Sequence, residues 1–185
     1  QLNNLENPYG ACNVTSIAMV LKFYGVDSRT PEDINNDVQL EDILYQKTLE
    51  WDAEYGFGGA NCSRHQPQFL IRLLREWAQK YGDGKLQSSY FKNVTSEEEM
   101  KQHLAKENPV IVHGYFTNSG HIIVIKGYDE AEGVWICNDP NGKWLGYQGG
   151  YADESVSGGD VRYSYDELRA VWDVDGESWC HFPLS

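Results

Sequence analysis

The sequence is short of positive charge and has no long apolar run, which argues against two classes of protein. Only 15 Lys and Arg stand against 28 Asp and Glu among 185 residues, for a formal net charge of −13. A surface this acidic repels phosphate backbones, so we do not expect nucleic acid as a partner. No stretch approaches the roughly 18 consecutive apolar residues of a membrane span, and no basic and then apolar signal peptide begins the chain. We therefore expect a soluble chain, and its start at Gln1 without a Met indicates a processed or excised fragment.

The cysteines also lack the spacing of a metal site. No CxxC pair occurs, and no His stands at zinc-ligand spacing from any of Cys12, Cys62, Cys137 and Cys180. We therefore expect no structural metal. A disulfide between Cys62 and Cys180 is an alternative that applies only if the protein is exported.

The first half of the chain carries helical patterns. With 41% hydrophobic residues, a chain of this length is expected to fold as one domain over residues 1–185. Apolar spacing predicts helices over residues 12–24, from residue 31 to about residue 51 in one or two pieces, and from residue 67 to about residue 82. Thr95 with Glu98 predicts a capping box that opens a further helix.

The second half changes its period. Runs of β-branched and aromatic residues over 109–116, 121–128 and 133–137 predict an antiparallel meander. Shorter strands are predicted at 85–91 and 178–182, and a polar loop that ends near residue 160 is followed by a capped helix at 164–172. The sequence thus predicts an α+β fold, with a helical N-terminal half that carries Cys12 packed on a C-terminal antiparallel sheet.

Cys12 follows a turn and begins a predicted helix. In NPYGACNVTSIAMVLKFYG, Gly10 precedes Cys12 by two residues, and apolar residues follow at helical spacing. A thiol in the first turn of a helix lies near the positive end of the helix dipole and near unpaired N–H groups, which favour the thiolate. The alternative is a small hydrophobic residue in a core. The turn and the helix together favour Cys12 as a nucleophile.

His121 and Asp139 are predicted to meet at one end of the sheet. His121 begins one predicted strand after the turn TNSG, and Asp139 ends the next strand. If the hairpin turns around Glu130, the numbers of facing residues sum to about 261, which sets His121 against Asp139 and Pro140. We expect the carboxylate to accept the proton of Nδ1 and leave Nε2 to take a proton from sulfur.

The remaining histidines compete for the role of base. His113 lies in a neighbouring predicted strand and is the main alternative to His121. The other three suit solvated positions better, and they are His65, His103 and His181.

Acyl chemistry also needs hydrogen-bond donors for the oxyanion. The backbone N–H of Cys12 is one candidate. A side-chain amide upstream is the second, and the residues themselves leave open whether it belongs to Gln1, Asn3, Asn4 or Asn7.

Three stretches of the sequence, NPYGACNVTSIAMVLKFYGV, SGHIIVIKGYD and NDPNGKW, together resemble the C39-like group of papain-like cysteine peptidases, relatives of the bacteriocin-processing peptidase domains. In that group a Gln lies upstream, the Cys heads a helix, a His heads a strand, and an Asp precedes Pro at the end of the next strand. The resemblance implies Cys12 as nucleophile, His121 as general base and then acid, Asp139 as the residue that orients it, and Gln1 as oxyanion donor. It also implies a papain-like fold, a bacterial or phage origin, and no metal or organic cofactor.

The function that follows is hydrolysis of a peptide or amide bond through a thioester acyl-enzyme. Alternatives are acyl transfer of the transglutaminase or amidase type, hydrolysis of a cell-wall peptide, and a catalytically inactive peptide-binding module. The expected partner is a peptide or protein substrate, and relatives that act extracellularly favour a secreted or cell-surface location. Loops at 56–63 and 142–160 are expected to border the substrate groove. Candidate aromatic walls are Trp51, Trp144, Tyr147 and Tyr151, although most of these four are expected to be ordinary core or surface aromatics.

Overall fold

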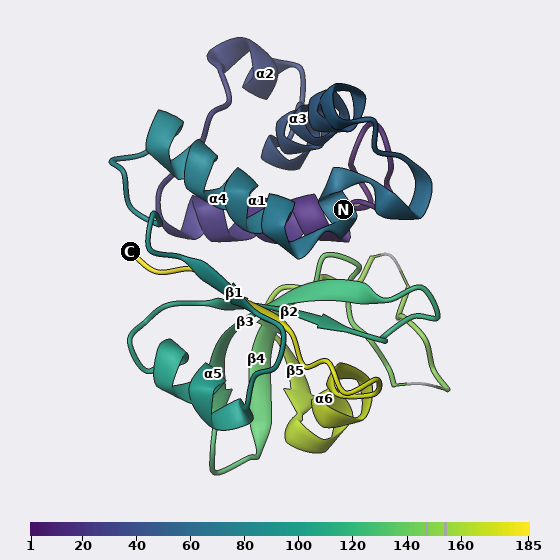
Figure 1. Ribbon diagram of the computed structural model, residues 1–185. Helices are drawn as coiled ribbons and strands as arrows, with labels where there is room; N and C mark the ends of the chain where they lie inside the picture. The colour runs from purple at the N-terminus through teal and green to yellow at the C-terminus, as the bar shows by residue number, and fades with distance from the viewer. Residues whose placement is uncertain (147, 154) are drawn as a thin grey trace. The chain divides into compact units, whose positions relative to one another are not determined.

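The computed structural model describes residues 1–146, 148–153 and 155–185 (Figure 1). The chain divides into two compact units, one formed by residues 1–89 with 184–185 and the other by residues 90–183. We call them unit 1 and unit 2 and describe each by itself. The α+β class is confirmed, because helices build unit 1 and an antiparallel sheet builds unit 2. The assignment of residues 1–185 to one domain stays a prediction.

Unit 1 is helical, as predicted. Its helices are α1 (Cys12–Phe23), α2 (Pro31–Asn35), α3 (Leu40–Tyr55) and α4 (Pro67–Tyr81), with two short 3-10 turns, η1 (Gly59–Asn61) and η2 (Ser63–His65), in the glycine-rich segment. The strongly amphipathic α4 follows from apolar residues at helical spacing, which form a buried face on this helix. Helix α1 contacts both α3 and α4, so the helix that begins with Cys12 has two neighbours to fix its axis.

Unit 2 is built on a six-stranded antiparallel sheet. Its strands, in chain order, are β1 (Tyr90–Lys92), β2 (Val110–Gly114), β3 (His121–Asp129), β4 (Val134–Asn138), β5 (Val161–Ser164) and β6 (Cys180–Phe182). Their order across the sheet is β1-β6-β2-β3-β4-β5. The predicted meander forms its centre, since β2 pairs with β3 and β3 with β4.

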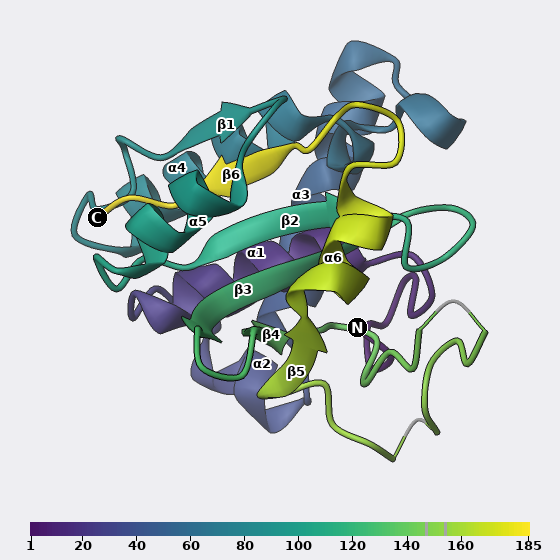
Figure 2. The same cartoon turned by 90° about the horizontal axis from the view of Figure 1, so that it is seen from below.

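Two helices cover one face of this sheet. Helices α5 (Glu97–Leu104) and α6 (Tyr165–Trp172) lie on the same side of the strands in both views (Figures 1 and 2). Their buried residues join alternate residues of the strands in a single apolar core, which includes Met100, Val112, Ile123, Trp135 and Leu168. Burial of residues this size stabilises the unit by about 1.5 to 3 kcal/mol per side chain. The core therefore fixes the strands whose ends carry the candidate chemistry.

Three sequence predictions about unit 2 are wrong in detail. Strand β5 is missing from the prediction, because its four residues lie between the polar loop that ends near residue 160 and the helix predicted from residue 164. The capping box of α5 is formed by Ser96 and Glu99, one residue later than predicted. In the β3–β4 hairpin Val124 faces Asn138, which is one residue from the predicted register. A bulge between Ile125 and Gly127 shifts the register by one more.

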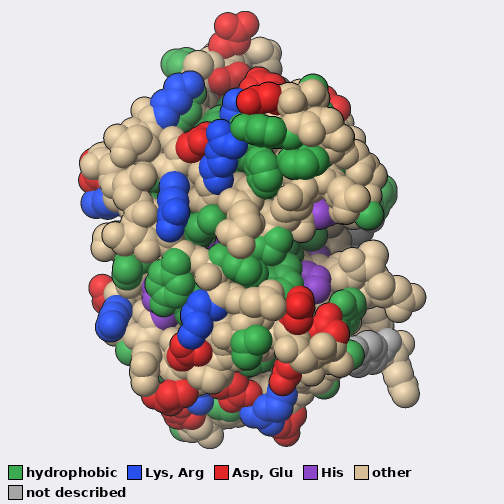
Figure 3. Space-filling view, in the orientation of Figure 1, with side chains coloured by type: hydrophobic (Ala, Val, Ile, Leu, Met, Phe, Trp, Pro, Cys, Tyr) green, Lys and Arg blue, Asp and Glu red, His purple; other side chains and the backbone are tan. Residues whose placement is uncertain are grey.

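Charged side chains are mixed on the surface. On the face drawn in Figure 3, Lys and Arg stand interspersed with Asp and Glu. Among the residues that the structure describes, no helix is long and apolar enough to cross a membrane.

Candidate active site

Cys12 is the first residue of α1, as the sequence predicts. The N-cap residue is Ala11, whose methyl side chain cannot accept a hydrogen bond from the first turn, and no acidic residue lies in that turn. The turn before it closes through a hydrogen bond from the Gly10 N–H to the Asn7 carbonyl oxygen, 3.1 Å long. The thiol is half-buried. Helix α1 is twelve residues long, and its first turn holds no carboxylate. The start of such a helix stabilises a thiolate.

The loop before Cys12 is held by polar contacts inside unit 1. The Leu5 N–H donates to the Asp42 carboxylate at 2.8 Å, and the Asn7 side-chain amide donates to the Tyr45 hydroxyl at 3.3 Å. Both acceptors lie on α3. The Asn4 side-chain oxygen accepts the N–H groups of residues 6 and 7, so its amide is part of the loop's own structure.

Gln1 begins this held loop. Its carbonyl oxygen accepts the Asn4 N–H at 2.8 Å, and the side chain is half-buried. The side-chain NH2 of Asn7 is engaged with Tyr45, which weakens its case as an oxyanion donor, whereas the side-chain NH2 of Asn4 has no hydrogen-bond partner among the described residues. Gln1, Asn4 and the backbone N–H of Cys12 therefore remain candidates for the oxyanion donors.

His121 is the first residue of β3 and faces Gly114 across the β2–β3 ladder. The preceding turn closes through a bond from the Gly120 N–H to the Thr117 carbonyl, and Gly120 has a φ of +81°. A Cβ at Gly120 would lie 2.6 Å from Nε2 of His113. Both the positive φ and the close approach require glycine at this position. The turn that contains Gly120 thus places His121 at the start of β3.

His121 and Asp139 meet, as predicted, but through the other ring nitrogen. Nε2 of His121 lies 2.7 Å from Oδ1 of Asp139, and both residues are buried. An ionised carboxylate can only accept, so Nε2 carries the proton in this bond. The prediction that Nδ1 faces the carboxylate is wrong, because ring orientation depends on packing that strand register alone does not define. Nδ1 is therefore the nitrogen to which we assign proton transfer below.

The Asp139 carboxylate is the centre of a larger network. Oδ1 also accepts the Asn141 N–H at 2.9 Å, while Oδ2 accepts the hydroxyls of Tyr151 at 3.1 Å and Tyr163 at 2.9 Å. With four donors, both oxygens are well satisfied despite their burial. Tyr163 cannot be identified from the sequence alone, because the pattern does not predict strand β5.

Aromatic rings flank the imidazole. Phe116 and Tyr151 make edge contacts with it, with ring centroids 5.9 and 5.6 Å away. Of the four candidate subsite walls, Trp51 and Trp144 are buried and belong to the cores of their units, as the sequence predicts for most of them. Tyr151 lies beside His121, and Tyr147 lies outside the described residues.

The other histidines have different surroundings. His113 stacks on Trp179 with ring centroids 4.6 Å apart, and burial lowers its pKa. Nε2 of His103 lies 2.7 Å from the Pro183 carbonyl oxygen. Contrary to prediction, His103 and His181 are buried, whereas His65 is exposed. The structure shows a carboxylate partner for His121, which favours it over His113 as the base.

The remaining cysteines are poor nucleophile candidates. All four cysteines lie in the described part of the chain and are free thiols, so the Cys62–Cys180 disulfide is not formed. Burial raises the pKa of Cys62 and Cys137, and it raises that of Cys180 to about 12. Buried thiols of this kind are inert.

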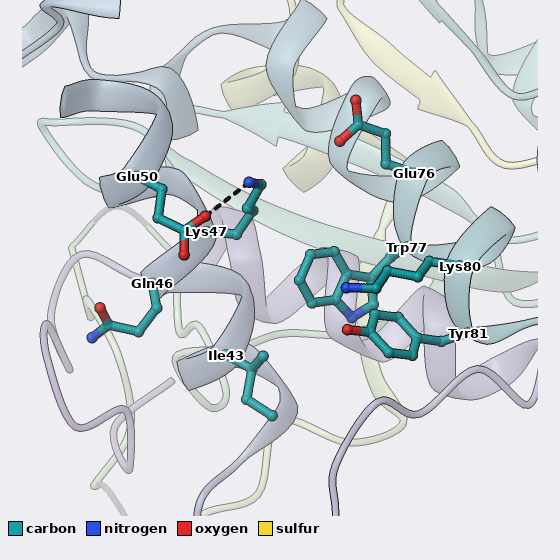
Figure 4. Close-up of a pocket in the computed structure, with 8 residues that line it drawn as sticks. All are labelled: Ile43, Gln46, Lys47, Glu50, Glu76, Trp77, Lys80 and Tyr81. Atoms are coloured by element: carbon teal, nitrogen blue, oxygen red, sulfur yellow. Dashed lines mark hydrogen bonds and ion pairs between the residues drawn. The ribbon is translucent and has the colours of Figure 1, made fainter. Parts of the chain in front are cut away.

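A groove of about 380 Å³ lies on α3 and α4 of unit 1 (Figure 4). Its eight lining residues are Ile43, Gln46, Lys47, Glu50, Glu76, Trp77, Lys80 and Tyr81. Two ion pairs involve charged residues of this lining. Lys47 pairs with Glu50, and Glu76 pairs with Arg72, which lies outside the lining. None of these eight side chains is a thiol or an imidazole, so the groove cannot supply the nucleophile or the base.

Residues 1–168 match the Peptidase_C39 like family. The chain belongs to this family. It is thus a member of a family of cysteine-type peptidases, as the resemblance implied. The chain is also 28% identical over 162 residues to the uncharacterized protein YvpB of Bacillus subtilis (strain 168). That match covers 76% of this chain but only 62% of YvpB.

One solved structure supports the papain-like fold of the family. A crystal structure described as a C39-like peptidase from Bacillus anthracis gives a TM-score of 0.52 at 15% identity, over 98% of this chain and 91% of that one. The Pseudomonas avirulence protein AvrPphB gives a TM-score of 0.43 at 12% identity, over 97% of this chain and 93% of that one.

The network around Asp139 predicts a stability effect. Asp139→Ala is expected to lower the free energy of unfolding by about 3 kcal/mol, because it leaves the four donors without their acceptor. Urea denaturation followed by tryptophan fluorescence measures this loss. Asp83→Ala, which removes an exposed carboxylate, should change stability by less than about 0.5 kcal/mol. Equal losses in the two variants would contradict a buried network.

Proposed function

We propose that this chain hydrolyses peptide bonds with Cys12 as nucleophile, His121 as base and then acid, Asp139 as the orienting residue and Gln1 as an oxyanion donor. The observation that carries the proposal is the buried 2.7 Å contact between His121 Nε2 and Asp139. A hydrogen-bonded imidazole and a helix-start thiol, in a chain of a cysteine peptidase family, are the parts that thiol acyl chemistry needs.

In the first step, Nδ1 of His121 takes the proton of the Cys12 thiol. Asp139 holds the ring through Nε2–H and stabilises the imidazolium that forms. The start of α1 stabilises the thiolate on the other side of the transfer. The ion pair is the reactive state, because the thiolate and not the thiol attacks carbonyl carbon.

Acylation then follows. Sγ of Cys12 attacks the carbonyl carbon of the scissile bond, and the carbonyl oxygen takes the negative charge. We assign the Cys12 backbone N–H and the Gln1 side-chain amide as donors to this oxyanion. When the carbonyl re-forms, the C–N bond breaks and the imidazolium gives its proton to the leaving amine. The product is a thioester on Cys12.

Water completes the reaction. His121, now neutral, takes a proton from water as the oxygen attacks the thioester, and it returns a proton to sulfur as the thiol leaves. If an amine replaces water in this step, the same residues perform acyl transfer, which is the alternative of the transglutaminase or amidase type.

The charge of the chain bears on the substrate. A protein with a net charge of −13 attracts basic or neutral peptides more than acidic ones. A cell-wall peptide is one alternative substrate. An inactive peptide-binding module would keep the fold but would lose the activation of Cys12.

Activation of Cys12 by His121 predicts a change in alkylation. Iodoacetamide should modify Cys12 at pH 6 at least about tenfold faster in the parent protein than in His121→Ala, since an unassisted thiol with a pKa of about 8.5 holds little thiolate there. Timed mass spectrometry of the Cys12 peptide measures the rate. His65→Ala removes an exposed histidine of unit 1 and should leave the rate unchanged. The same pH dependence of the Cys12 alkylation rate in the parent and in His121→Ala would count against the proposal.

The activity itself is tested with a peptide library. The parent is expected to cleave library peptides, and Cys12→Ala should retain the fold and lose cleavage by at least about 1000-fold, because no nucleophile remains. Mass spectrometry identifies the cleaved bonds, and circular dichroism checks the fold. An added amine acceptor distinguishes hydrolysis from transfer. Cleavage by Cys12→Ala at the parent's rate would place the nucleophile elsewhere.

A further inference from the structure

Strand β5 has a side chain that reaches the candidate site. Tyr163 lies on β5 opposite Trp135 of β4, at the edge of the sheet. Its side chain is 2% exposed, and its hydroxyl donates to Oδ2 of Asp139 at 2.9 Å. The strand therefore brings a buried phenol to the carboxylate that binds His121.

The direction of the Tyr163 hydroxyl is defined from both sides. Its oxygen accepts the Trp144 N–H at 3.0 Å while its proton points to Asp139. Burial, and then the Asp139 carboxylate, raise the pKa of Tyr163. Tyr163 consequently stays protonated and remains a donor throughout the pH range in which an imidazole titrates.

Tyr151 lies in the loop between β4 and β5 and approaches the same Oδ2 atom of Asp139. Its hydroxyl donates to Oδ2 of Asp139 at 3.1 Å, and its ring contacts the imidazole of His121 edge-on. An isolated bridge to Trp144 holds Tyr151 in the loop. Tyr151 thus touches both members of the His121–Asp139 pair.

The backbone of Asp139 is fixed as well. Its N–H donates to the Gly158 carbonyl oxygen at 2.8 Å, and a Cβ at Gly158 would overlap the Asp139 carbonyl oxygen. With the main chain held, the side chain can still rotate about its Cα–Cβ and Cβ–Cγ bonds. Two hydroxyls on Oδ2 oppose that rotation and keep Oδ1 on the imidazole.

We propose that Tyr163 and Tyr151 are positioning residues of the peptidase, which hold the Asp139 carboxylate in place and moderate its pull on the imidazolium of His121. The proposal rests on the function proposed above. Each hydroxyl that donates to the carboxylate shares its negative charge, so less of that charge acts on His121. The two tyrosines thus set both the orientation and the basicity of the base.

Several titratable groups of unit 2 surround the base. Asp139 binds the ring directly, Tyr151 contacts it from the loop, and His113 of β2 lies close enough to interact electrostatically with it. Asp175 and Glu177 act on His113 in turn. The test therefore changes only a hydroxyl and leaves these other groups in place.

The test uses Tyr163→Phe, Tyr151→Phe and the control Tyr90→Phe. Phenylalanine keeps each ring and removes one hydroxyl. Tyr90 lies on β1 at the opposite edge of the same sheet. The readouts are kcat and KM on a cleaved library peptide, and the pKa of His121 from an NMR pH titration of ¹⁵N-labelled protein, with His121→Gln to assign its signals.

For Tyr163→Phe we expect kcat to fall about tenfold with KM changed less than about twofold, because a charge-assisted hydrogen bond that orients the base is lost. The pKa of His121 should rise by about half a unit, because the carboxylate then pulls more strongly on the imidazolium. Tyr151→Phe should shift both quantities in the same direction and by less, because its bond is longer and its side chain less buried. Tyr90→Phe should change neither.

An unchanged kcat with an unchanged His121 pKa in Tyr163→Phe would overturn the proposal. So would a lower kcat with the pKa unmoved, since a loss of general packing gives that pattern. If Tyr163→Phe does not fold by circular dichroism, Tyr151→Phe decides by the same two readouts. The titration needs no substrate, so a parent protein without peptidase activity would refute the proposed function and still leave the coupling of the tyrosines to His121 open to measurement.

Discussion

The hydrogen bond between His121 and Asp139 is the interaction on which the account of this site depends. A buried carboxylate costs several kcal/mol unless donors surround it. Here the start of β3 and the edge strand β5 each supply one donor, and the loop between β4 and β5 supplies two. The sheet of unit 2 therefore does more than carry the two residues. The pairing of β3 with β4 places the start of β3, which is His121, near the end of β4, which Asp139 follows. The edge strand β5 adds Tyr163.

The division of the chain into two units assigns different chemistry to each. Unit 1 holds a thiol at a helix start, with Gln1 in the loop that precedes it. Unit 2 holds an imidazole and the carboxylate that orients it. In the proposed mechanism neither unit is sufficient, because a thiol needs a base and a base needs a nucleophile to act on. Membership of a cysteine peptidase family is the reason to connect them.

Much of the fold could be predicted because its signals are local. Apolar spacing after Cys12, the turn before His121 and the β-branched runs of the meander all depend on neighbours within a few residues, and each gave the correct element. Strand β5 was missed because four residues between a polar loop and a helix carry too little alternation to be distinguished. The capping box was misplaced by one because Thr95 and Ser96 compete for the same role.

The site shows a sharper limit of the sequence. The pairing of His121 with Asp139 is predicted correctly although the predicted hairpin register is wrong by one residue, because diagonal as well as facing neighbours of two paired strands lie within reach of each other. The identity of the bonded nitrogen did not follow, because ring orientation is set by Phe116, Tyr151 and the carboxylate together. The tyrosine donors could not be predicted from the sequence either, because Tyr163 is 24 residues away from the carboxylate it binds.

The most direct test of the central claim is the protonation of the two ring nitrogens of neutral His121. In long-range ¹H–¹⁵N spectra recorded above the pKa of His121, the account predicts that Nε2 carries the proton and Nδ1 does not. The opposite tautomer, with the proton on Nδ1, would mean that Asp139 does not accept the Nε2 proton and would contradict the mechanism at its first step.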